Sequence, residues 1–263
     1  MRFFWLASAA ALVFGAVNMA RADIKTEIVN YKGGTVESHG YLAYEDKVAD
    51  KRPGVLIIPE WWGLTEYPKE RAKQLAKLGY VALVADIYGD GKVTDDPKEA
   101  GKWAGELMAG PRKELRGRVR AALEELRKNP HVDPTRLAAI GYCFGGTTSL
   151  ELARSGADVQ AVISFHGNLT TGQPAVPGEF KAKVLVCHGG DDKFVSPESI
   201  QAFQDEMNKA NVDWQFNIYS HAVHAFTNPE ADKHHIPGIA YNREADVRSF
   251  VAMVNFFHEV FAK

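Results

Sequence analysis

The chain has little cysteine, no strong net charge and no long apolar run beyond its first residues. Two cysteines in 263 residues exclude a disulfide-rich scaffold. A net charge of -2, from 31 basic and 33 acidic residues, leaves no electrostatic footprint for nucleic acid or an anionic membrane. After Asp23 no stretch is long and apolar enough to span a bilayer. These absences favour chemistry on a small molecule, without a nucleic-acid partner.

What is present at the N-terminus is typical of an export signal. Met1 and Arg2 are followed by the apolar stretch 3–17 and then by Ala20-Arg21-Ala22. A charged start, an apolar middle and a small-x-small end predict a signal peptide over residues 1–22. The alternative is an uncleaved anchor, but the apolar stretch is short for a bilayer span. We expect a secreted or periplasmic protein with one domain over residues 23–263.

Short apolar runs alternate with amphipathic stretches along the rest of the chain. Such continuously apolar runs are typical of parallel strands that helices cover on both faces. We expect strands over residues 55–58, 81–85, 137–140, 161–165, 184–187 and 215–219. We expect helices over residues 68–78, 114–127, 146–154, 197–209 and 245–260. An antiparallel hairpin, residues 24–30 and 36–44, completes a mixed sheet of eight strands.

A cysteine stands between close-set glycines directly after the apolar run 137–140, in the hexapeptide Gly-Tyr-Cys-Phe-Gly-Gly. In α/β-hydrolases a strand enters a helix through a very tight turn of this kind, which presents the nucleophile. Serine is the commoner nucleophile, whereas a cysteine attacks as a thiolate once its proton is removed. The pattern predicts an α/β-hydrolase fold, with an eight-stranded mostly parallel sheet and helices on both faces, and Cys143 as its nucleophile.

Partners for this cysteine are expected at the carboxyl ends of other strands, where ligands bind in open parallel sheets. After the run 184–187 comes a Gly-x-x-Asp turn, which offers Asp192 or, as a minority alternative, Asp191. After the run 215–219 come His221 and His224, of which we favour His224 as the base. A histidine can take the thiol proton, and an acid on its far nitrogen fixes the tautomer. The order nucleophile, acid, histidine is that of α/β-hydrolases.

The second cysteine, Cys187, ends the apolar run 184–186. An oxidising compartment would allow it to pair with Cys143. We expect no such disulfide, because the two strands are not immediate neighbours in this fold. Strands lie about 4.8 Å apart, and two such steps exceed the Cα separation of about 5.5 Å in a disulfide. Cys187 is therefore predicted to be a small buried hydrophobe.

Four separate motifs show that the chain resembles the dienelactone hydrolase family from about Ile24 to its end. They are Ile-Ile-Pro-Glu-Trp-Trp-Gly, Val-Ala-Asp-Ile-Tyr-Gly, Gly-Tyr-Cys-Phe-Gly-Gly, and the paired segments Gly-Gly-Asp-Asp and His-Ala-Phe. The resemblance implies that Glu60 sits beside the resting cysteine, controls its proton and lets go when substrate binds. It also implies an oxyanion hole made by the backbone N–H groups of Phe144 and Trp61. The helix N-terminus at Phe144 suits an oxyanion or a thiolate.

The sequence departs from these relatives where two arginines bind the carboxylate of dienelactone. The resemblance places one just after the Asp-Ile-Tyr segment and the other just after the His-Ala-Phe segment. This chain has Gly89-Asp90 and Thr227-Asn228 there. Asp90 would repel an anionic substrate if it lined the pocket. We therefore expect the hydrolase chemistry with a different substrate.

Aromatic residues near the expected site are Trp62, Tyr88 and Phe226. They favour an apolar mouth for neutral or aromatic esters and lactones, although aromatic residues at strand ends are more often ordinary core. The lid-like segments 90–97 and 226–241 are expected to set specificity.

Two charged clusters have simpler interpretations. His234 and His235 lack a third ligand at a suitable spacing, so we expect a solvated loop and no metal site. Arginines and glutamates on one helix predict a salt-bridged exposed face: Arg112, Arg116, Arg118 and Arg120 with Glu114, Glu124 and Glu125.

The leading hypothesis is an exported monomeric hydrolase that cleaves small carboxylic esters or lactones without a cofactor. Cys143 would attack the carbonyl, and His224 oriented by Asp192 would activate water. A serine-type peptidase or esterase is disfavoured by the cysteine itself. A non-catalytic binding protein or a thiol redox protein on the same scaffold is the alternative. The redox reading lacks a nearby resolving cysteine.

Overall fold

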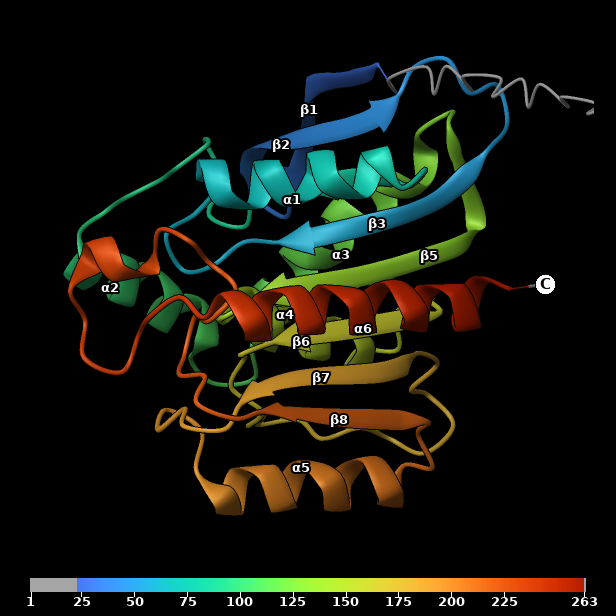
Figure 1. Ribbon diagram of the computed structural model, residues 1–263. Helices are drawn as coiled ribbons and strands as arrows, with labels where there is room; N and C mark the ends of the chain where they lie inside the picture. Colours follow the sequence, from blue (N-terminus) through green and yellow to red (C-terminus); the bar gives the residue numbers. More distant parts are fainter. Residues whose placement is uncertain (1–22, 263) are drawn as a thin grey trace, which may run out of the picture.

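An eight-stranded sheet runs through the middle of the molecule, in the order β1-β2-β4-β3-β5-β6-β7-β8 (Figure 1). The computed structural model describes residues 23–262, so the expected signal peptide 1–22 lies outside the described residues. The strands are β1 (Ile24–Gly33), β2 (Val36–Glu45), β3 (Arg52–Ile58), β4 (Val81–Val84), β5 (Val132–Tyr142), β6 (Ala161–Phe165), β7 (Lys183–Gly189) and β8 (Trp214–Tyr219). β2 is antiparallel to β1 and β4, and all other pairs are parallel. The predicted α/β-hydrolase architecture is confirmed.

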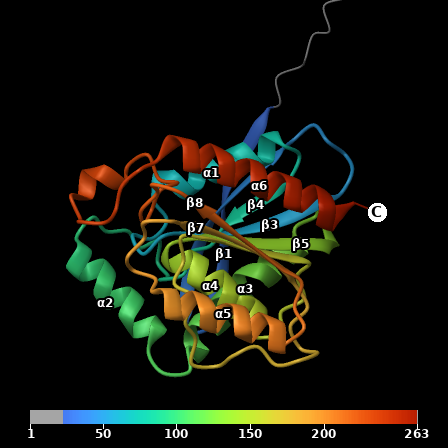
Figure 2. The same cartoon turned by 60° about the horizontal axis from the view of Figure 1, so that its bottom comes forward.

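Helices cover both faces of this sheet (Figure 2). α1 (Glu66–Lys77) and α6 (Arg243–Phe261) pack on one face. α3 (Lys113–Lys128), α4 (Phe144–Arg154) and α5 (Pro197–Lys209) pack on the other. α2 (Pro97–Met108) lies at the carboxyl ends of the strands beside α3, and a short 3-10 helix, η1 (Ala231–His234), precedes α6.

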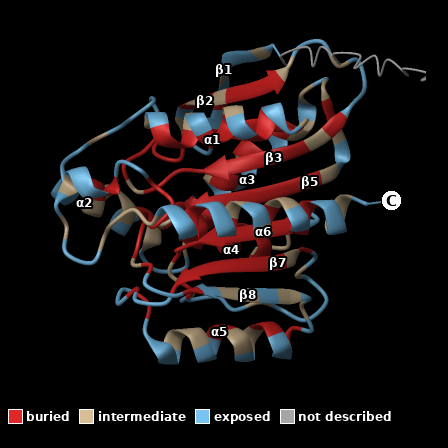
Figure 3. Cartoon of the chain, viewed as in Figure 1, coloured by how far each residue is buried: buried red, intermediate tan, exposed pale blue. Residues whose placement is uncertain are grey.

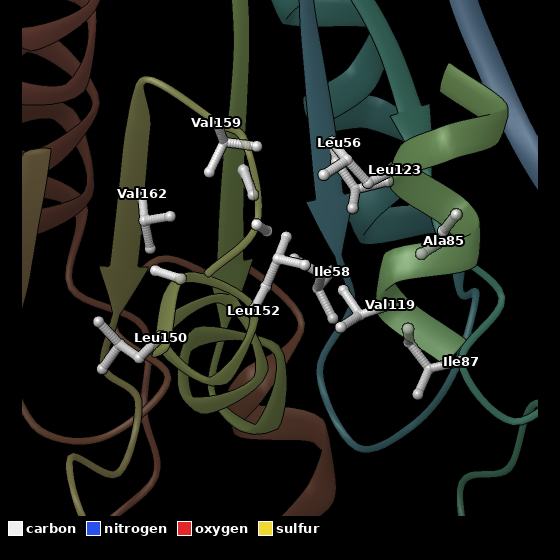
Figure 4. Packing of buried hydrophobic residues seen from close by; sticks show 14 of the residues in the cluster. Leu56, Ile58, Ala85, Ile87, Val119, Leu123, Leu150, Leu152, Val159 and Val162 are labelled. Carbon is white, nitrogen blue, oxygen red and sulfur yellow. The ribbon is translucent and has the colours of Figure 1, made fainter. Parts of the chain in front are cut away.

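The buried strands separate two hydrophobic cores, because successive side chains of a strand point to opposite faces. In β3, Leu56 and Ile58 contribute to the core under α3 and α4, whereas Val55 and Ile57 contribute to the core under α1 and α6. All four side chains are fully buried. Figure 4 shows Leu56 and Ile58 beside Val119 and Leu123 of α3, and Figure 3 shows that burial is concentrated in the central strands. The continuous apolar runs of the sequence are thus explained by cover on both faces.

One helix was not expected from the sequence. α2 occupies Pro97–Met108, directly after the lid-like segment predicted over residues 90–97. Its start carries a signal, since the Asp96 side chain accepts a hydrogen bond from the Lys98 N–H and proline stands at the first helical position. Only Ala100 and Leu107 of α2 are buried, so this helix contributes little to the core.

The predicted exposed arginine face is wrong for three of its members, because Arg112, Arg116 and Arg118 expose only 11%, 14% and 14% of their side chains. Arg112 and Arg116 each donate a 2.8 Å hydrogen bond to the carboxylate of Glu151 on α4. Glu151 is fully buried. Arg154 adds a third guanidinium at 3.3 Å. Arg118 pairs with Glu114 as expected. These ion pairs hold α3 against α4, the helix that follows Cys143.

Both cysteines are free, and Cys187 is fully buried as predicted. One strand, β6, separates the strand that ends before Cys143 from the strand that contains Cys187. Within residues 23–262, no helix combines the length and the apolar character needed to cross a membrane.

Candidate active site

The Cys143 turn lies at the centre of the sheet, between the last residue of β5 and the first residue of α4. Cys143 has φ 54° and ψ -118°, a conformation that L-residues rarely adopt and that marks a strained turn. The chain can fold so tightly only without side chains at two positions. A Cβ on Gly141 would overlap the Gly145 carbonyl, and a Cβ on Gly145 would overlap the Ile58 carbonyl at the end of β3. The glycines thus bring the cysteine close to the strand that precedes Glu60.

Three predicted residues from three strand ends are brought together here. The Cys143 Sγ lies 3.0 Å from His224 Nε2, and His224 Nδ1 lies 2.9 Å from Asp192 Oδ2. Asp192 is buried and its other oxygen accepts the Phe194 backbone N–H at 2.9 Å. The contacts connect a thiol, an imidazole and a carboxylate in the order that a nucleophile, a base and an orienting acid require.

The two alternatives from the sequence lie outside this arrangement. Asp191 and His221 are exposed and lie 3.9 Å apart at the surface. The structure therefore favours Asp192 and His224 on geometry.

The charge of His224 is set by competing effects. Burial lowers the pKa of this imidazole, but the charges and hydrogen bonds of Cys143 and Asp192 outweigh burial and raise the pKa to about 10. An imidazolium held between Cys143 Sγ and the Asp192 carboxylate is therefore the favoured form of His224 at neutral pH.

Glu60 is buried two residues after the end of β3, where it accepts a 2.6 Å hydrogen bond from the Asn228 side-chain amide. Burial raises the pKa of Glu60 to about 7, against the Asn228 hydrogen bond, which lowers it. Among residues 23–262, the hydrogen-bond partner of the carboxylate is Asn228 rather than Cys143. The carboxylate can therefore hold or lose a proton near neutral pH.

The two implied oxyanion donors lie on neighbouring strand ends, because Ile58 of β3 pairs with Gly141 of β5. Phe144 opens α4, where first-turn N–H groups have no acceptor within the helix and the dipole favours negative charge. The Trp61 carbonyl accepts a 3.0 Å hydrogen bond from Tyr88 Oη, which fixes the position of this loop.

A fourth strand end contributes a residue that the sequence analysis missed. His166 follows β6, is fully buried and has φ 41°. Its Nδ1 lies 3.0 Å from the Cys143 backbone N, and its Nε2 lies 2.7 Å from Thr227 Oγ1. Burial and the charges of His224 and Arg71 hold the pKa of His166 well below its usual range. The search of strand ends that found His224 would also have found this histidine.

The aromatic residues are distributed differently from the prediction. Phe226 is fully buried against His166 and Tyr219, so it lies in the core and cannot line an open mouth. Tyr88 is also buried and stacks on Phe144. The residue that does expose an aromatic ring is Phe194, which was not singled out; it is 51% exposed and its ring centroid lies 5.1 Å from that of His224.

Trp62 lines a separate cavity of about 470 Å³ with Asn228 and His234. The His234 ring stacks on Trp62 at 3.9 Å, so it is half-buried rather than solvated as predicted, whereas His235 is exposed. In the described part of the chain no group of three metal-ligating side chains is found. Asn228 is the residue shared between this cavity and the Glu60 carboxylate.

Comparison with known proteins gives consistent results. The model of the "Dienelactone hydrolase family" matches residues 39–261. A Bradyrhizobium protein named "Probable 2-oxo-3-(5-oxofuran-2-ylidene)propanoate lactonase" is 32% identical over 71% of this chain and 77% of its own length. A crystal structure of a dienelactone hydrolase-like promiscuous phosphotriesterase from metagenomic libraries is 42% identical, with a TM-score of 0.86, over 91% of this chain and 99% of that one. A structure described as m3DLH is 44% identical, also with a TM-score of 0.86 and the same coverage.

Proposed function

The chain belongs to the dienelactone hydrolase family, and we propose that it hydrolyses neutral carboxylic esters or lactones with Cys143 as the nucleophile. The observation that carries the proposal is the line of hydrogen bonds from Cys143 Sγ through His224 to Asp192, at 3.0 and 2.9 Å. Nucleophile, base and orienting acid within hydrogen-bond reach are the geometric signature of acyl transfer.

In the proposed reaction, the Cys143 thiolate attacks the carbonyl carbon and the carbonyl electron pair moves to oxygen. The backbone N–H groups of Phe144 and Trp61 stabilise this oxyanion. As the C–O bond breaks, the His224 imidazolium gives its proton to the departing alkoxide, leaving an acyl thioester. Neutral His224 then takes a proton from water, whose hydroxide attacks the thioester and expels the thiolate. The acid product loses its proton to solvent, and the ion pair is restored.

Asp192 supports both half-reactions from the far side of the imidazole. Its Oδ2 holds the Nδ1 proton, so the other nitrogen faces Cys143 in the tautomer that transfers protons. Asp192 is buried, and the Phe194 N–H holds its other oxygen. Water therefore does not compete with His224 for this carboxylate.

A neutral substrate is favoured by the groups at the two positions where relatives carry arginine. Thr227 and Asn228 are engaged by His166 and Glu60, and neither carries charge. Asp90 is exposed and lies 3.7 Å from Lys92. The phosphotriesterase relative supports this choice, because phosphotriesters are also uncharged electrophiles. The exposed ring of Phe194 beside His224 offers an apolar contact for the substrate.

The site of action is a separate part of the proposal. The charged start, apolar middle and Ala-x-Ala ending of residues 1–22 support export to the periplasm or the medium. The intact mass of the protein recovered from that compartment tests it, since cleavage after Ala22 would leave Asp23 as the first residue.

The central experiment compares residues 23–263 and its Cys143→Ala variant under reducing conditions. The substrates are neutral aryl and alkyl esters, neutral lactones, dienelactone and a neutral phosphotriester. We expect turnover of neutral esters or lactones, complete loss in Cys143→Ala and at most weak activity in Cys143→Ser. Cys187→Ala is the matched control, because that thiol is buried outside the site, and it should retain activity.

Activity that survives in Cys143→Ala would refute the thiol mechanism. Binding of the esters without turnover by either protein would instead support the non-catalytic reading. Reversible inactivation by mild peroxide, with a sulfenic acid at Cys143 and no hydrolysis, would support a redox protein.

A further inference from the structure

His166 occupies a central position that the proposed reaction does not use. It follows β6, which lies between the strand leading to Cys143 and the strand leading to Asp192 (Figure 1). Its side chain has no exposed surface, and its backbone has φ 41°. A buried histidine in a left-handed conformation is costly, so the surrounding contacts must hold it there.

The hydrogen bonds of His166 define its tautomer. A backbone N–H can only donate, so the Nδ1 atom that faces the Cys143 N–H at 3.0 Å must be an unprotonated acceptor. In a neutral imidazole the proton is then on Nε2, which donates to Thr227 Oγ1 at 2.7 Å. A second proton on Nδ1 would face the Cys143 N–H directly and break this bond.

Thr227 is itself held on the other side. Its Oγ1 accepts a 2.6 Å hydrogen bond from Tyr67 Oη, and its carbonyl accepts one from Arg71 Nη2 at 2.8 Å. Arg71 is buried and forms an ion pair with Asp246 of α6. The hydroxyl that accepts the His166 hydrogen bond is therefore held by α1, which the Arg71–Asp246 pair in turn connects to α6.

Thr227 lies only three residues after His224, on the same loop. His166 thus connects the backbone of the nucleophile to the loop of the base. The rings of His166 and His224 are also in direct edge-to-face contact, with centroids 5.4 Å apart. The contacts of His166 therefore flank Cys143 Sγ and His224 Nε2, which lie 3.0 Å apart.

We propose that His166 and Thr227 form a positioning pair that holds the Cys143 turn at the correct distance from His224. The strained turn requires such support, since the Cys143 N–H is shared between His166 Nδ1 and the Phe165 carbonyl, both at 3.0 Å. The side-chain hydrogen bonds of the pair go to the Cys143 backbone N–H, to Tyr67 and to each other, and not to Cys143 Sγ or the nitrogens of His224. The inference rests on the proposed role of Cys143 as nucleophile.

Two substitutions at position 166 separate the roles of its ring. In His166→Asn the amide oxygen can occupy the place of Nδ1 and accept the Cys143 N–H, and asparagine tolerates a positive φ. His166→Phe keeps an aromatic ring but offers no acceptor. Thr227→Val removes the hydroxyl that accepts the His166 Nε2 hydrogen bond and leaves a side chain of nearly the same shape.

We expect His166→Phe and Thr227→Val to lower kcat by about tenfold or more, the factor that corresponds to one lost buried hydrogen bond, with KM nearly unchanged. The alkylation of Cys143 by iodoacetamide at neutral pH should slow in both, because a displaced thiol loses its pairing with His224. His166→Asn should recover most of the alkylation rate and most of kcat.

The control is His131→Asn, which removes a histidine that stacks on Tyr44 before the start of β5, at the opposite end of the strands. It should change urea stability only. If His166→Phe and Thr227→Val behave like this control, the pair only packs the core and the proposal is wrong. If His166→Asn is as impaired as His166→Phe, the Nδ1 acceptor is not what matters and the proposal is also wrong.

Failure of the proposed function would be recognised separately. Activity in Cys143→Ala would refute the nucleophile, whereas the alkylation rate measures the thiol environment without any substrate. Should His166→Phe fail to fold, Thr227→Val and His166→Asn still decide the outcome.

Discussion

The Glu60 carboxylate accepts a 2.6 Å hydrogen bond from the Asn228 side-chain amide, so an uncharged donor is the partner of a carboxylate that burial has removed from water. Where a cation would make ionisation favourable, an amide offsets only part of the desolvation. The pKa of Glu60 consequently stays near 7.

The first prediction concerns stability. Unfolded, a glutamate has a pKa of about 4.3, so the folded protein binds this proton more tightly than the unfolded chain does. The charged carboxylate then destabilises the fold increasingly from about pH 4.3 to about pH 7, and by a constant amount above it. Glu60→Gln should be more stable than the parent at pH 8, by up to about 4 kcal/mol, and equal to it at pH 4.

Urea denaturation at pH 4, 6 and 8 measures this difference. Glu70→Gln, which alters an exposed glutamate paired with Lys73, is the control and should show little change across the series. A gain that is the same at every pH would contradict the assignment of the effect to ionisation of Glu60.

The second prediction concerns the charge of His224. Burial opposes the imidazolium, and the Cys143 thiolate and Asp192 together raise the pKa of His224 to about 10. NMR of the ring nitrogens should therefore show a cation at pH 8. In Cys143→Ala the thiolate is gone while burial remains, so the pKa should fall. An unchanged titration in that variant would show that no ion pair exists.

The third prediction distinguishes the two neighbouring aspartates. Asp192→Asn removes the charge that orients His224 and should lower kcat by about a thousandfold or more. Asp191→Asn alters an exposed side chain and should leave kcat within about twofold of the parent. Steady-state kinetics of both variants on the same ester is sufficient. If the two substitutions lowered kcat equally, the assignment of Asp192 as the orienting acid would be wrong.

The fourth prediction concerns the buried ion network of Glu151. In Glu151→Gln the guanidinium groups of Arg112, Arg116 and Arg154 lose their shared carboxylate. The free energy of unfolding, measured by urea denaturation, should fall by about 3–5 kcal/mol. The control Glu124→Gln removes an exposed pair with Arg127 and should cost less than about 1 kcal/mol. A small loss at Glu151 would mean that the arginines find other partners.

The fifth prediction concerns substrate charge. Asn228→Arg places a cation where this chain has a neutral amide, and it should raise kcat/KM for a carboxylate-bearing lactone relative to a neutral one by about tenfold. Asn228→Gln controls for the change in length without charge. If the ratio rises equally in both variants, charge at this position does not govern the choice of substrate.

The sequence predicted those parts of the site whose signals are local. Cys143, Asp192 and His224 each follow an apolar run, and the carboxyl ends of parallel strands meet at one edge of a sheet. The buried role of Cys187 followed from the same strand order. These inferences needed only the periodicity of the strands and the chemistry of the side chains.

Other parts depend on packing that no local pattern encodes. Arg116 was assigned to an exposed face because its helix also carries glutamates, but its partner Glu151 lies 35 residues further along the chain on another helix. Phe226 was placed at the mouth because it follows His224, yet its ring turns into the core. His166 had a visible signal, but its contact with a backbone N–H could only be found in three dimensions.

The contact between Gly145 and the Ile58 carbonyl makes the spacing between the thiol and Glu60 a property of the main chain. Any residue larger than glycine at position 145 would force apart the two strand ends that lead to Cys143 and to Glu60. A single methyl group at this position would therefore disturb both sides of the candidate site at once.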